Sequence, residues 1–255
     1  MNTLVHKIGQ AIPNSLAKDW LRRILFPILF TASGSQTVKI GPPNDKIPVT
    51  ITHFPLFKER LGEREIEGYL LEYTPKKGDV VINAGGYHGY FAIYLSRKVG
   101  PTGHVYCFEP DKTNASIIQK NIKRNNCKNI TIIPKGLWDK NTILAFETRG
   151  SSSRHASNGK AAKKAKFCRL DDALKKHNIN KVDFISMDIE GAEIEALNGA
   201  EETIKANPNI SLAIASYHVV DGAPTSARVE KKLKSMGLKS HTAFPRHVTT
   251  YGSRL

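Results

Sequence analysis

The residues best suited to bind a small cofactor are a glycine-rich turn and an acid that follows it in the chain. The turn is NAGGYHG at residues 83–89, and the acid is Glu109. Glycines let the backbone approach a ligand closely, and a carboxylate can accept hydrogen bonds from both hydroxyls of a ribose. An acid about 20 residues after a glycine turn is typical of nucleotide-cofactor sites.

A second group of polar residues has the side chains needed for proton transfer. Asp188 and Glu190 follow the apolar run 182–187, and His218 follows the apolar run 212–216. Each of these side chains can take a proton from a hydroxyl. Asp188 and Glu190 could instead hold a divalent cation, and Glu190 could simply favour a helix N-terminus. A purely structural role is the alternative for His218.

The elements that must position these residues alternate between strand and helix from residue 79 onward. The expected strands cover residues 79–83, 104–108, 130–133, 182–187 and 210–216. The expected helices cover residues 89–98, 111–125, 171–176, 194–205 and 229–236. This alternation predicts an α/β fold with a mostly parallel, twisted sheet and helices on both faces. Ligands of such sheets bind at the carboxyl ends of the strands, where Glu109, Asp188 and His218 are expected.

The remaining segments are less regular. Residues 141–148 and 165–170 are expected to pair as strands. Between them, residues 150–166 carry five Lys and Arg and no acid, which predicts a mobile basic loop. A helix over 58–73 is expected before the first core strand, and the tail from Ser240 favours a last strand.

The first 57 residues are expected to form a cover of helix and β-structure, with the main domain at 58–255. Residues 1 to about 34 favour helix, and runs at 37–40 and 49–53 favour a hairpin. The segment WLRRILFPILF carries two arginines and a proline and is too short to cross a bilayer. Helical spacing within 16–30 predicts an amphipathic helix that either packs on the domain or lies on an anionic membrane surface.

The composition favours partners with negative charge. The chain of 255 residues carries 38 Lys and Arg against 23 Asp and Glu, a formal net charge of +15. Such a surface suits nucleic acid, anionic lipid, phosphorylated sugars or an anionic cofactor. The three cysteines, at positions 107, 127 and 168, share no metal-ligand or redox spacing. This pattern predicts a reducing, cytoplasmic location without disulfides, and contact with a membrane would be peripheral.

The glycine turn by itself leaves the cofactor open. It does not match the pattern GxGxxG. In proteins with that pattern, the amides of the following helix bind the pyrophosphate of a dinucleotide. S-adenosylmethionine has no phosphate, and it needs close backbone approach to its amino acid part and an acid for its ribose. The spacing from the turn to Glu109 suits either ligand.

Four separated motifs favour one of the two cofactors. They are VVINAGGYHGYF at 80–91, VYCFEPD at 105–111, CRLDDAL at 168–174 and VDFISMDIEGAEIEALNGA at 182–200. With these motifs the sequence resembles the FkbM-type family of S-adenosylmethionine-dependent methyltransferases over about residues 60–245. The GGYHG loop and the strand end at 215–218 are similar to archaeal-type members. The resemblance implies a Rossmann-like class I methyltransferase fold with a seven-stranded sheet, and methyl transfer to hydroxyl oxygens.

The resemblance also implies which residues bind the cofactor. They are Asn83, Gly85, Gly86, His88, Gly89, Glu109, Leu137, Trp138 and Asp188. Glu109 would hold the ribose hydroxyls, and the segment 136–139 would line the adenine. Asp188, Glu190 and His218 remain the candidates for the base that takes the proton of the acceptor. No metal site is predicted, although a divalent cation remains an alternative.

Two departures from the family pattern bear on catalysis. The family usually has Asp at the end of the first strand, where this chain has Asn83, and Lys before MDIEG, where it has Ser186. The first change removes a negative charge near a cationic cofactor, and the second removes a cation near Asp188.

The sequence therefore predicts an S-adenosylmethionine-dependent O-methyltransferase, with a sugar or glycan hydroxyl as the acceptor. An RNA methyltransferase is one alternative, which the net charge permits. It is less favoured because no stacking aromatic residues are interleaved with the basic loop. A cofactor-binding protein with impaired catalysis is the other alternative, and Asn83 and Ser186 motivate it.

Overall fold

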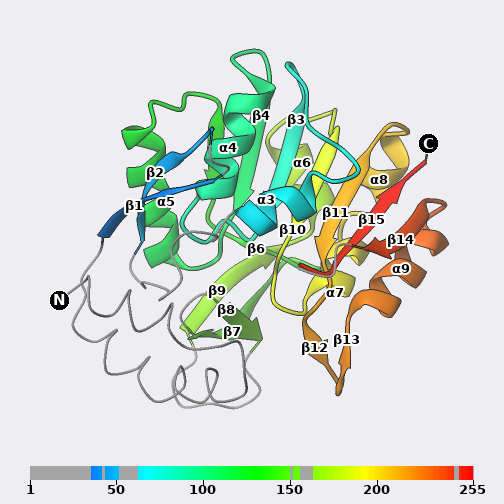
Figure 1. Cartoon of the computed structure of the whole chain (residues 1–255). Helices are drawn as coiled ribbons and strands as arrows, with labels where there is room; N and C mark the ends of the chain where they lie inside the picture. The colour runs from blue at the N-terminus through cyan, green and yellow to red at the C-terminus, as the bar shows by residue number, and fades with distance from the viewer. Residues whose placement is uncertain are drawn as a thin grey trace, which may run out of the picture.

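The computed structural model of the chain describes residues 36–41, 44–51, 63–149, 152–155, 163–243 and 247–254. Its centre is a twisted seven-stranded sheet with the order β14-β15-β11-β10-β3-β4-β5 (Figure 1). In chain order these strands are β3 (Val80–Ala84), β4 (His104–Phe108), β5 (Ile130–Ile133), β10 (Phe184–Met187), β11 (Ser211–Ala215), β14 (Lys239–Ala243) and β15 (Thr249–Ser253). Strand β15 pairs antiparallel with both of its neighbours, and every other pair is parallel. The predicted α/β fold with a mostly parallel sheet is confirmed.

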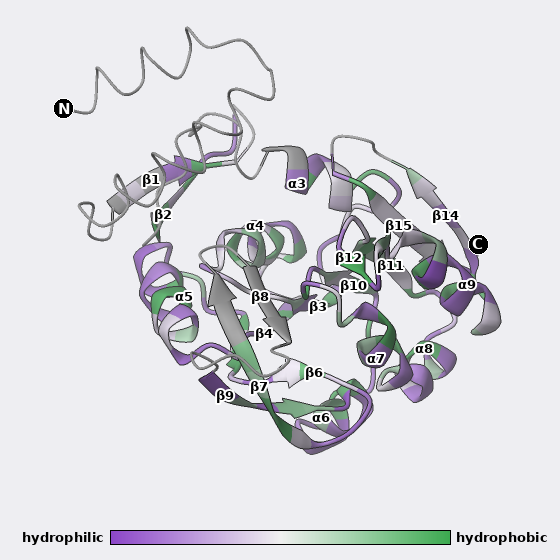
Figure 2. Ribbon diagram, turned by 90° about the horizontal axis from the view of Figure 1, so that it is seen from below, coloured by the Kyte–Doolittle hydropathy of each residue, from purple (hydrophilic) through white to green (hydrophobic). Residues whose placement is uncertain are grey.

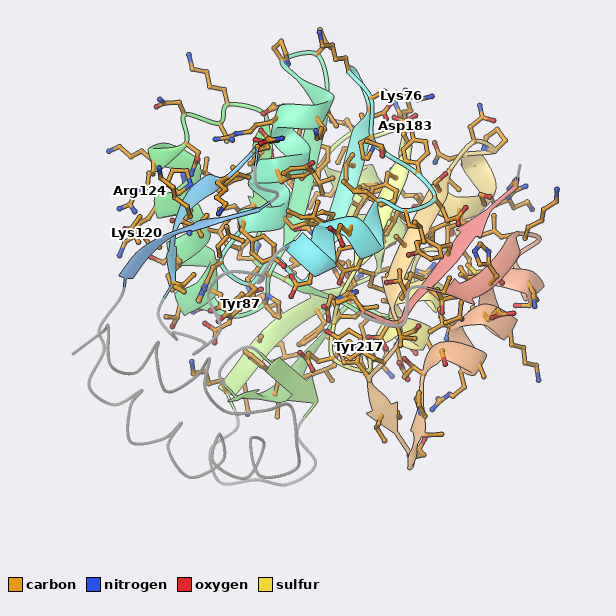
Figure 3. The ribbon with its side chains drawn as sticks, in the orientation of Figure 1. Lys76, Tyr87, Lys120, Arg124, Asp183 and Tyr217 are labelled. Atoms are coloured by element: carbon orange, nitrogen blue, oxygen red, sulfur yellow. The ribbon has the colours of Figure 1, made fainter. Side chains whose placement is uncertain are left out.

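The strand order reverses in the middle of the sheet, between β3 and β10, and the carboxyl ends of the strands form the edge at which a ligand is expected. From β3 the chain moves outward to β4 and β5, then returns to the other side of β3 to form β10 and β11. Ligands of α/β sheets bind at the carboxyl ends of the strands where the order reverses in this way. Figure 3 shows Tyr87 and Tyr217 at this edge, whereas Lys76 and Asp183 lie at the opposite edge.

Helices cover both faces of the sheet, and each face has its own core. On one face lie α3 (Glu63–Tyr69), α4 (Tyr90–Val99) and α5 (Lys112–Arg124), with side chains from a hairpin added to the same core. The other face is covered by α6 (Leu170–Lys176), α7 (Glu193–Asn198), α8 (Glu201–Ala206) and α9 (Ser226–Ser235). Figure 2, which views the sheet along its strands, shows α4 on one side of β3 and α6 and α7 on the other. The sheet is therefore buried on both faces, as its near-continuous apolar strands require.

The hairpin consists of β1 (Gln36–Ile40) and β2 (Ile47–Ile51). It confirms the strand expected at 37–40 and the described part, 49–51, of the strand expected at 49–53. Fully buried Asn121 of α5 ties β2 to the rest of the molecule. Its Nδ2 donates to the Thr50 carbonyl at 3.0 Å and its Oδ1 accepts from the Thr50 N–H at 2.7 Å. The same Nδ2 donates to the His88 carbonyl at 2.7 Å, so one side chain joins the hairpin to the glycine turn.

A second, four-stranded sheet has the order β6-β9-β7-β8. Its strands are β6 (Gly136–Leu137), β7 (Thr142–Arg149), β8 (Ser152–His155) and β9 (Lys163–Cys168). The predicted pairing of 141–148 with 165–170 is confirmed by the antiparallel ladder of β7 and β9. The loop predicted over 150–166 is wrong for 152–155 and 163–166, which are strands. Composition misled here, because ladder hydrogen bonds form between backbones whatever polar side chains they carry.

Three predicted elements have different bounds. The helix expected over 194–205 is two helices, α7 and α8, that meet at Gly199. A Cβ at Gly199 would lie 2.1 Å from the Trp138 carbonyl oxygen, so the chain turns where another loop touches it. The helix expected over 58–73 begins within the described residues at Glu63 and ends at Tyr69. The tail holds two strands, β14 and β15, where one was expected.

Several expectations fall on residues outside the described part of the chain. They are the helix over 1–34, the amphipathic segment 16–30 and the middle of the basic loop at 156–162. None of the helices in the described ranges has the length and hydrophobicity needed to span a bilayer.

Removing the side chain of Asn121 should destabilise the fold. Asn121→Ala leaves the Thr50 N–H and two buried carbonyl groups without their partner, at a cost of about 1–3 kcal/mol. Urea denaturation followed by circular dichroism measures this free energy. The control is Lys120→Ala on the exposed side of the same helix, which should cost less than about 0.5 kcal/mol. Equal losses in the two variants would contradict the role given to Asn121.

Candidate active site at the carboxyl ends of the central strands

The glycine turn that follows β3 lies directly against the loop that follows β10. The amides of Gly85 and Gly86 both donate to the Phe108 carbonyl, at 3.0 and 3.1 Å. Gly85 has φ 88°, and a Cβ there would lie 1.9 Å from the Asp188 carbonyl oxygen. The Asp188 N–H in turn donates to the Ala84 carbonyl at 2.9 Å. Only glycine permits this approach, which brings the two loops together.

The other two glycines of the turn lie against α5. A Cβ at Gly86 would be 2.5 Å from Cys107 Sγ, and one at Gly89 would be 2.9 Å from Ile118 Cγ2. Gly89 also has φ 83° and begins α4. Packing alone therefore explains why these three positions need glycine. Their contact with a cofactor remains a prediction.

Glu109 follows β4 and is 4% exposed. Its Oε2 accepts from the Tyr87 N–H at 2.8 Å, and its Oε1 accepts from the Asp111 N–H at 2.9 Å. Burial raises its pKa to about 7, against the lowering effect of these backbone hydrogen bonds. Asn114 Nδ2 also donates to Oε1 at 3.4 Å, so Oε2 keeps a free acceptor position, whereas Oε1 can accept from a ligand only in place of this long hydrogen bond. The acid is therefore held in a fixed orientation and still has the capacity to bind a diol.

Tyr87 and His88 lie between the second and third glycines of the turn. Tyr87 has φ 46°, and its ring stacks on that of His88 with centroids 3.7 Å apart. His88 is fully buried, and its carbonyl accepts from Asn121. The predicted contact between His88 and the cofactor is not tested by this arrangement.

The segment predicted to line the adenine follows β5. Leu137 is 1% exposed and packs in the core beneath the sheet, so its side chain is occupied by protein contacts. The Trp138 N–H donates to the Cys168 carbonyl at 2.9 Å, and its ring meets Phe167 edge-on with centroids 6.1 Å apart. Nearby, Lys163 Nζ lies 3.0 Å from Asp111 Oδ2, which joins β9 to the loop after β4.

The two positions that depart from the family pattern face each other. Asn83 of β3 and Ser186 of β10 are paired in register, and both are almost fully buried. Asn83 Nδ2 donates to Ser186 Oγ at 3.1 Å, and Cys107 Sγ lies 3.7 Å from Asn83 Oδ1. The acid and the cation that the resemblance leads one to expect are thus replaced together by a neutral, hydrogen-bonded pair. Neither change leaves a buried charge without a partner.

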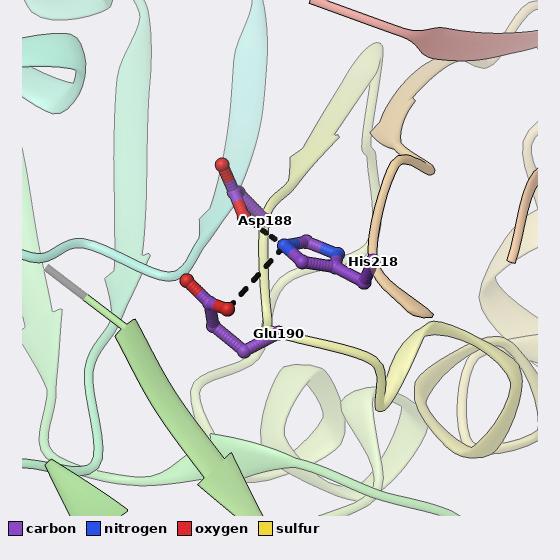
Figure 4. Close-up of side chains that lie close together, drawn as sticks. All are labelled: Asp188, Glu190 and His218. Carbon is purple, nitrogen blue, oxygen red and sulfur yellow. Dashed lines mark ion pairs between the residues drawn. The ribbon is translucent and has the colours of Figure 1, made fainter. Parts of the chain in front are cut away.

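Beside this pair lies a cluster of three carboxylates around one imidazole. His218 Nε2 lies 3.2 Å from Asp188 Oδ1 and 3.6 Å from Glu190 Oε2 (Figure 4). His218 Nδ1 lies 2.9 Å from Oε1 of fully buried Glu193. Asp188, Glu190 and His218, predicted from separate parts of the sequence, are therefore brought together.

The charges of this cluster fix the state of His218. Burial lowers the pKa of His218, but the contacts with Asp188 and Glu193 outweigh it and raise the pKa to about 10. The pKa of Asp188 moves the opposite way: burial raises it, while His218 and a tyrosine hydroxyl hold it below its ordinary range. In this state the imidazole is a cation at neutral pH and Asp188 is an anion.

Two tyrosines that the sequence analysis did not select complete the surroundings of Asp188. Tyr69 of α3 and Tyr217 both donate to Asp188 Oδ2, at 2.9 and 3.0 Å. Oδ1 is left to face His218. Tyr69 lies within the helix expected over 58–73, and Tyr217 immediately precedes His218, but neither position carries a sequence signal for contact with Asp188.

Glu65 was also missed. It lies one helical turn before Tyr69 in α3, and its charge acts on Tyr69, Tyr87 and Tyr217. Burial raises the pKa of Glu65 to about 8, with a further contribution from Asp188. The charge of Glu65 therefore acts on residues of both the glycine turn and the Asp188 cluster.

The strand order and the position of the glycine turn define a Rossmann-like class I methyltransferase fold. A methyltransferase FkbM from Methylobacillus flagellatus has a TM-score of 0.51 and 18% identity over 72% of this chain and 45% of that one. Fibrillarin from Aeropyrum pernix, solved with natively bound S-adenosyl-L-methionine, has a TM-score of 0.50 and 16% identity over 74% of each chain.

Sequence comparison identifies the family. The methyltransferase FkbM domain matches residues 82–239, so the chain belongs to the FkbM methyltransferase family. Methyltransferase 1 of Beauveria bassiana is 27% identical over 48% of this chain and 58% of its own length. Methyltransferase sdnD of Sordaria araneosa is 24% identical over 48% of this chain and 60% of its own length. The chain thus spans about three fifths of these relatives, and the resemblance drawn from the motifs is confirmed.

Asn83 and Ser186 should accept opposite charges together at a lower cost in stability than either residue accepts a charge alone. Asn83→Asp and Ser186→Lys each bury an unpaired charge, at a cost of about 3 kcal/mol or more. The double variant regains part of this loss through the new ion pair. Denaturant unfolding of all four proteins gives the interaction energy.

Ser186→Ala is the control, because it removes the hydroxyl without adding charge and should cost about 1 kcal/mol. Costs that simply add in the double variant would show that the two positions do not act as a pair.

Proposed function

We propose that this protein transfers a methyl group from S-adenosylmethionine to a hydroxyl oxygen of a sugar or glycan. The observation that carries the proposal is the meeting of three loops at the reversal of the strand order. The glycine turn after β3, Glu109 after β4 and Asp188 after β10 follow adjacent strands, and hydrogen bonds join them. Membership of the FkbM family supports methyl transfer as the reaction.

The cofactor would lie across these loops. Glu109 would accept hydrogen bonds from the two ribose hydroxyls, one at the free acceptor position of Oε2 and one at Oε1 in place of the long hydrogen bond from Asn114. The glycine turn would pass beneath the methionine part, and residues 136–139 would line the adenine. S-adenosylmethionine supplies an electrophilic methyl group on a positively charged sulfur, and Asp188 would place a negative charge near it.

A hydroxyl that attacks this methyl group must approach in line and must lose its proton. His218 does not suit the role of base, because a pKa of about 10 leaves it protonated at neutral pH. Asp188 and Glu190 remain candidates, but the low pKa of Asp188 makes it a weak proton acceptor. The pKa of Glu65, raised to about 8, is the best matched to a base that works near neutral pH.

Charge supports an acceptor with anionic groups. Lys163, Lys164 and Lys166 are exposed on β9, and the formal net charge of the chain is +15. Such a surface attracts phosphorylated or otherwise acidic acceptors. Contact of residues 16–30 with an anionic membrane, which would suit a lipid-linked glycan, stays a prediction. The hydrogen bond between Asn83 and Ser186 explains how the sheet accommodates both changes, and a cofactor-binding protein with impaired catalysis stays the alternative.

The proposal is tested by transfer of a labelled methyl group. The protein is incubated with tritiated S-adenosylmethionine and separate panels of neutral sugars, acidic glycans and RNA. Label that stays on a glycan after treatment with alkali, as a methyl ether does, supports O-methylation. Label found only in RNA overturns the glycan assignment, and the absence of cofactor binding by calorimetry overturns the whole proposal.

Glu109 should control the affinity for the cofactor. Glu109→Gln loses charge-assisted hydrogen bonds worth about 1.5–3 kcal/mol, which corresponds to roughly 10- to 100-fold weaker binding. Calorimetry with S-adenosylhomocysteine measures this change. The matched control is Glu202→Gln on exposed α8, which should bind as tightly as the unchanged protein. Unaltered affinity in Glu109→Gln would remove Glu109 from the ribose site.

The identity of the base can be read from the pH dependence of the reaction. If Glu65 takes the proton, kcat/KM rises with pH up to about 8, because the carboxyl group must be ionised to act. In Glu65→Gln the rise should vanish, and the rate should fall by about 100-fold or more. If Asp188 is the base, kcat/KM is already level above about pH 5, and the profile of Glu65→Gln keeps the shape of the unchanged protein.

A further inference from the structure

We propose that Asp188, Glu190 and His218 form a binding site for one divalent first-row transition-metal ion. Their three donor atoms, one from each side chain, all lie within 4.8 Å of one another. Figure 4 shows the imidazole of His218 pointing between the two carboxylates. His218 Nε2 lies 3.2 Å from Asp188 Oδ1 and 3.6 Å from Glu190 Oε2. A metal ion would lie between these three atoms and be coordinated by all of them.

The hydrogen bonding of His218 gives a second reason. Its side chain is only 3% exposed. Carboxylate oxygens lie near both ring nitrogens, yet neither nitrogen forms a hydrogen bond of acceptable geometry with any residue in the described ranges. A buried polar group without a hydrogen bond is costly. A metal ion bound to Nε2 would satisfy the atom that faces the two carboxylates.

The contacts around the cluster orient its donors in the way that metal sites require. Tyr69 and Tyr217 donate to Asp188 Oδ2, at 2.9 and 3.0 Å, and so leave Oδ1 directed at the site. Glu193, which is fully buried, lies 2.9 Å from His218 Nδ1 through its Oε1. A carboxylate beside the outer nitrogen of a histidine is the usual support of a histidine that binds metal through its other nitrogen.

The backbone also bends to bring Glu190 back to the cluster. Glu190 has φ 59° and Gly191 has φ 102°, both in the left-handed region. For a residue with a side chain, this conformation is unfavourable and needs support from its surroundings. The turn is held by a hydrogen bond from the Gly191 N–H to Glu193 Oε1 at 3.0 Å. The same Glu193 oxygen thus supports both the turn and the imidazole.

The donors indicate which metals fit. One imidazole and two carboxylates suit Mn²⁺, Fe²⁺ or Zn²⁺ better than Ca²⁺, which takes oxygen donors. Three protein donors leave coordination positions open for other oxygens. If the proposed methyl transfer is correct, a hydroxyl of the acceptor would occupy one of them, and the metal would lower its pKa. Metal binding itself does not depend on that reaction.

The site is tested with the metal alone. The full chain is freed of metal with EDTA, and Mn²⁺ is added while electron paramagnetic resonance follows the free ion; Zn²⁺ is tested by calorimetry. We expect one saturable site per chain. Asp188→Asn, Glu190→Gln and His218→Gln should each weaken binding by about tenfold or more. Glu195→Gln is the matched control, because it lies on the same helix as Glu193 but outside the cluster, and it should bind normally.

Two results would overturn the site: no saturable binding of either ion, or binding that all three substitutions leave unchanged. Circular dichroism identifies any variant that fails to fold, and Glu190→Gln is the mildest of the three because Glu190 is the farthest donor from Nε2. Metal binding without methyl transfer to any acceptor keeps the site and rejects the proposed function. Methyl transfer that persists in the presence of EDTA, in a protein shown to be free of metal, keeps the function and overturns the site's role in it.

Discussion

The contact between Gly85 and Asp188 is the constraint on which the rest of the site depends. A side chain at Gly85 would lie 1.9 Å from the Asp188 carbonyl oxygen, and the Asp188 N–H donates to Ala84 at 2.9 Å. The turn that would pass beneath a cofactor and the loop that carries the acid cluster are therefore one packed unit. Because this unit lies where the strand order reverses, residues from both halves of the sheet meet at a single edge.

Electrostatics then determines what the packed unit can do. Asp188, Glu190 and Glu193 surround His218, and buried carboxylates of like charge need a cation among them. The protonated imidazole supplies that cation in the structure, and the proposed metal ion would replace the proton on Nε2. The sheet beneath is kept neutral by the Asn83–Ser186 hydrogen bond, so the charges are confined to the loops above it. Two carboxyl groups near the packed unit have pKa values raised toward neutral pH, Glu109 to about 7 and Glu65 to about 8.

Most of the central sheet was predictable, because its signals are local. Apolar runs bounded by glycine, proline and charged residues correctly placed β4 and β5, and nearly placed β3, β10 and β11. The errors arose where a distant contact decides the local structure. The helix expected over 194–205 breaks at Gly199, which touches the Trp138 carbonyl. Residues 152–155 form a strand because β7 is available to pair with them, although their composition is typical of a loop.

The sequence alone determined the family, the alternation of strand and helix that builds most of the central sheet, and the identity of the acids that follow its strands. Each of these rests on patterns within about 20 residues, which helical and strand periodicity makes readable. Only the tertiary structure decided what those acids touch. Tyr69 reaches Asp188 across 119 positions of the chain, and Asn83 meets Ser186 across 103. Such contacts follow from the order of strands in the sheet, and no local pattern encodes that order. The same holds for the imidazole of His218, whose charge depends on carboxylates contributed by a separate loop and helix.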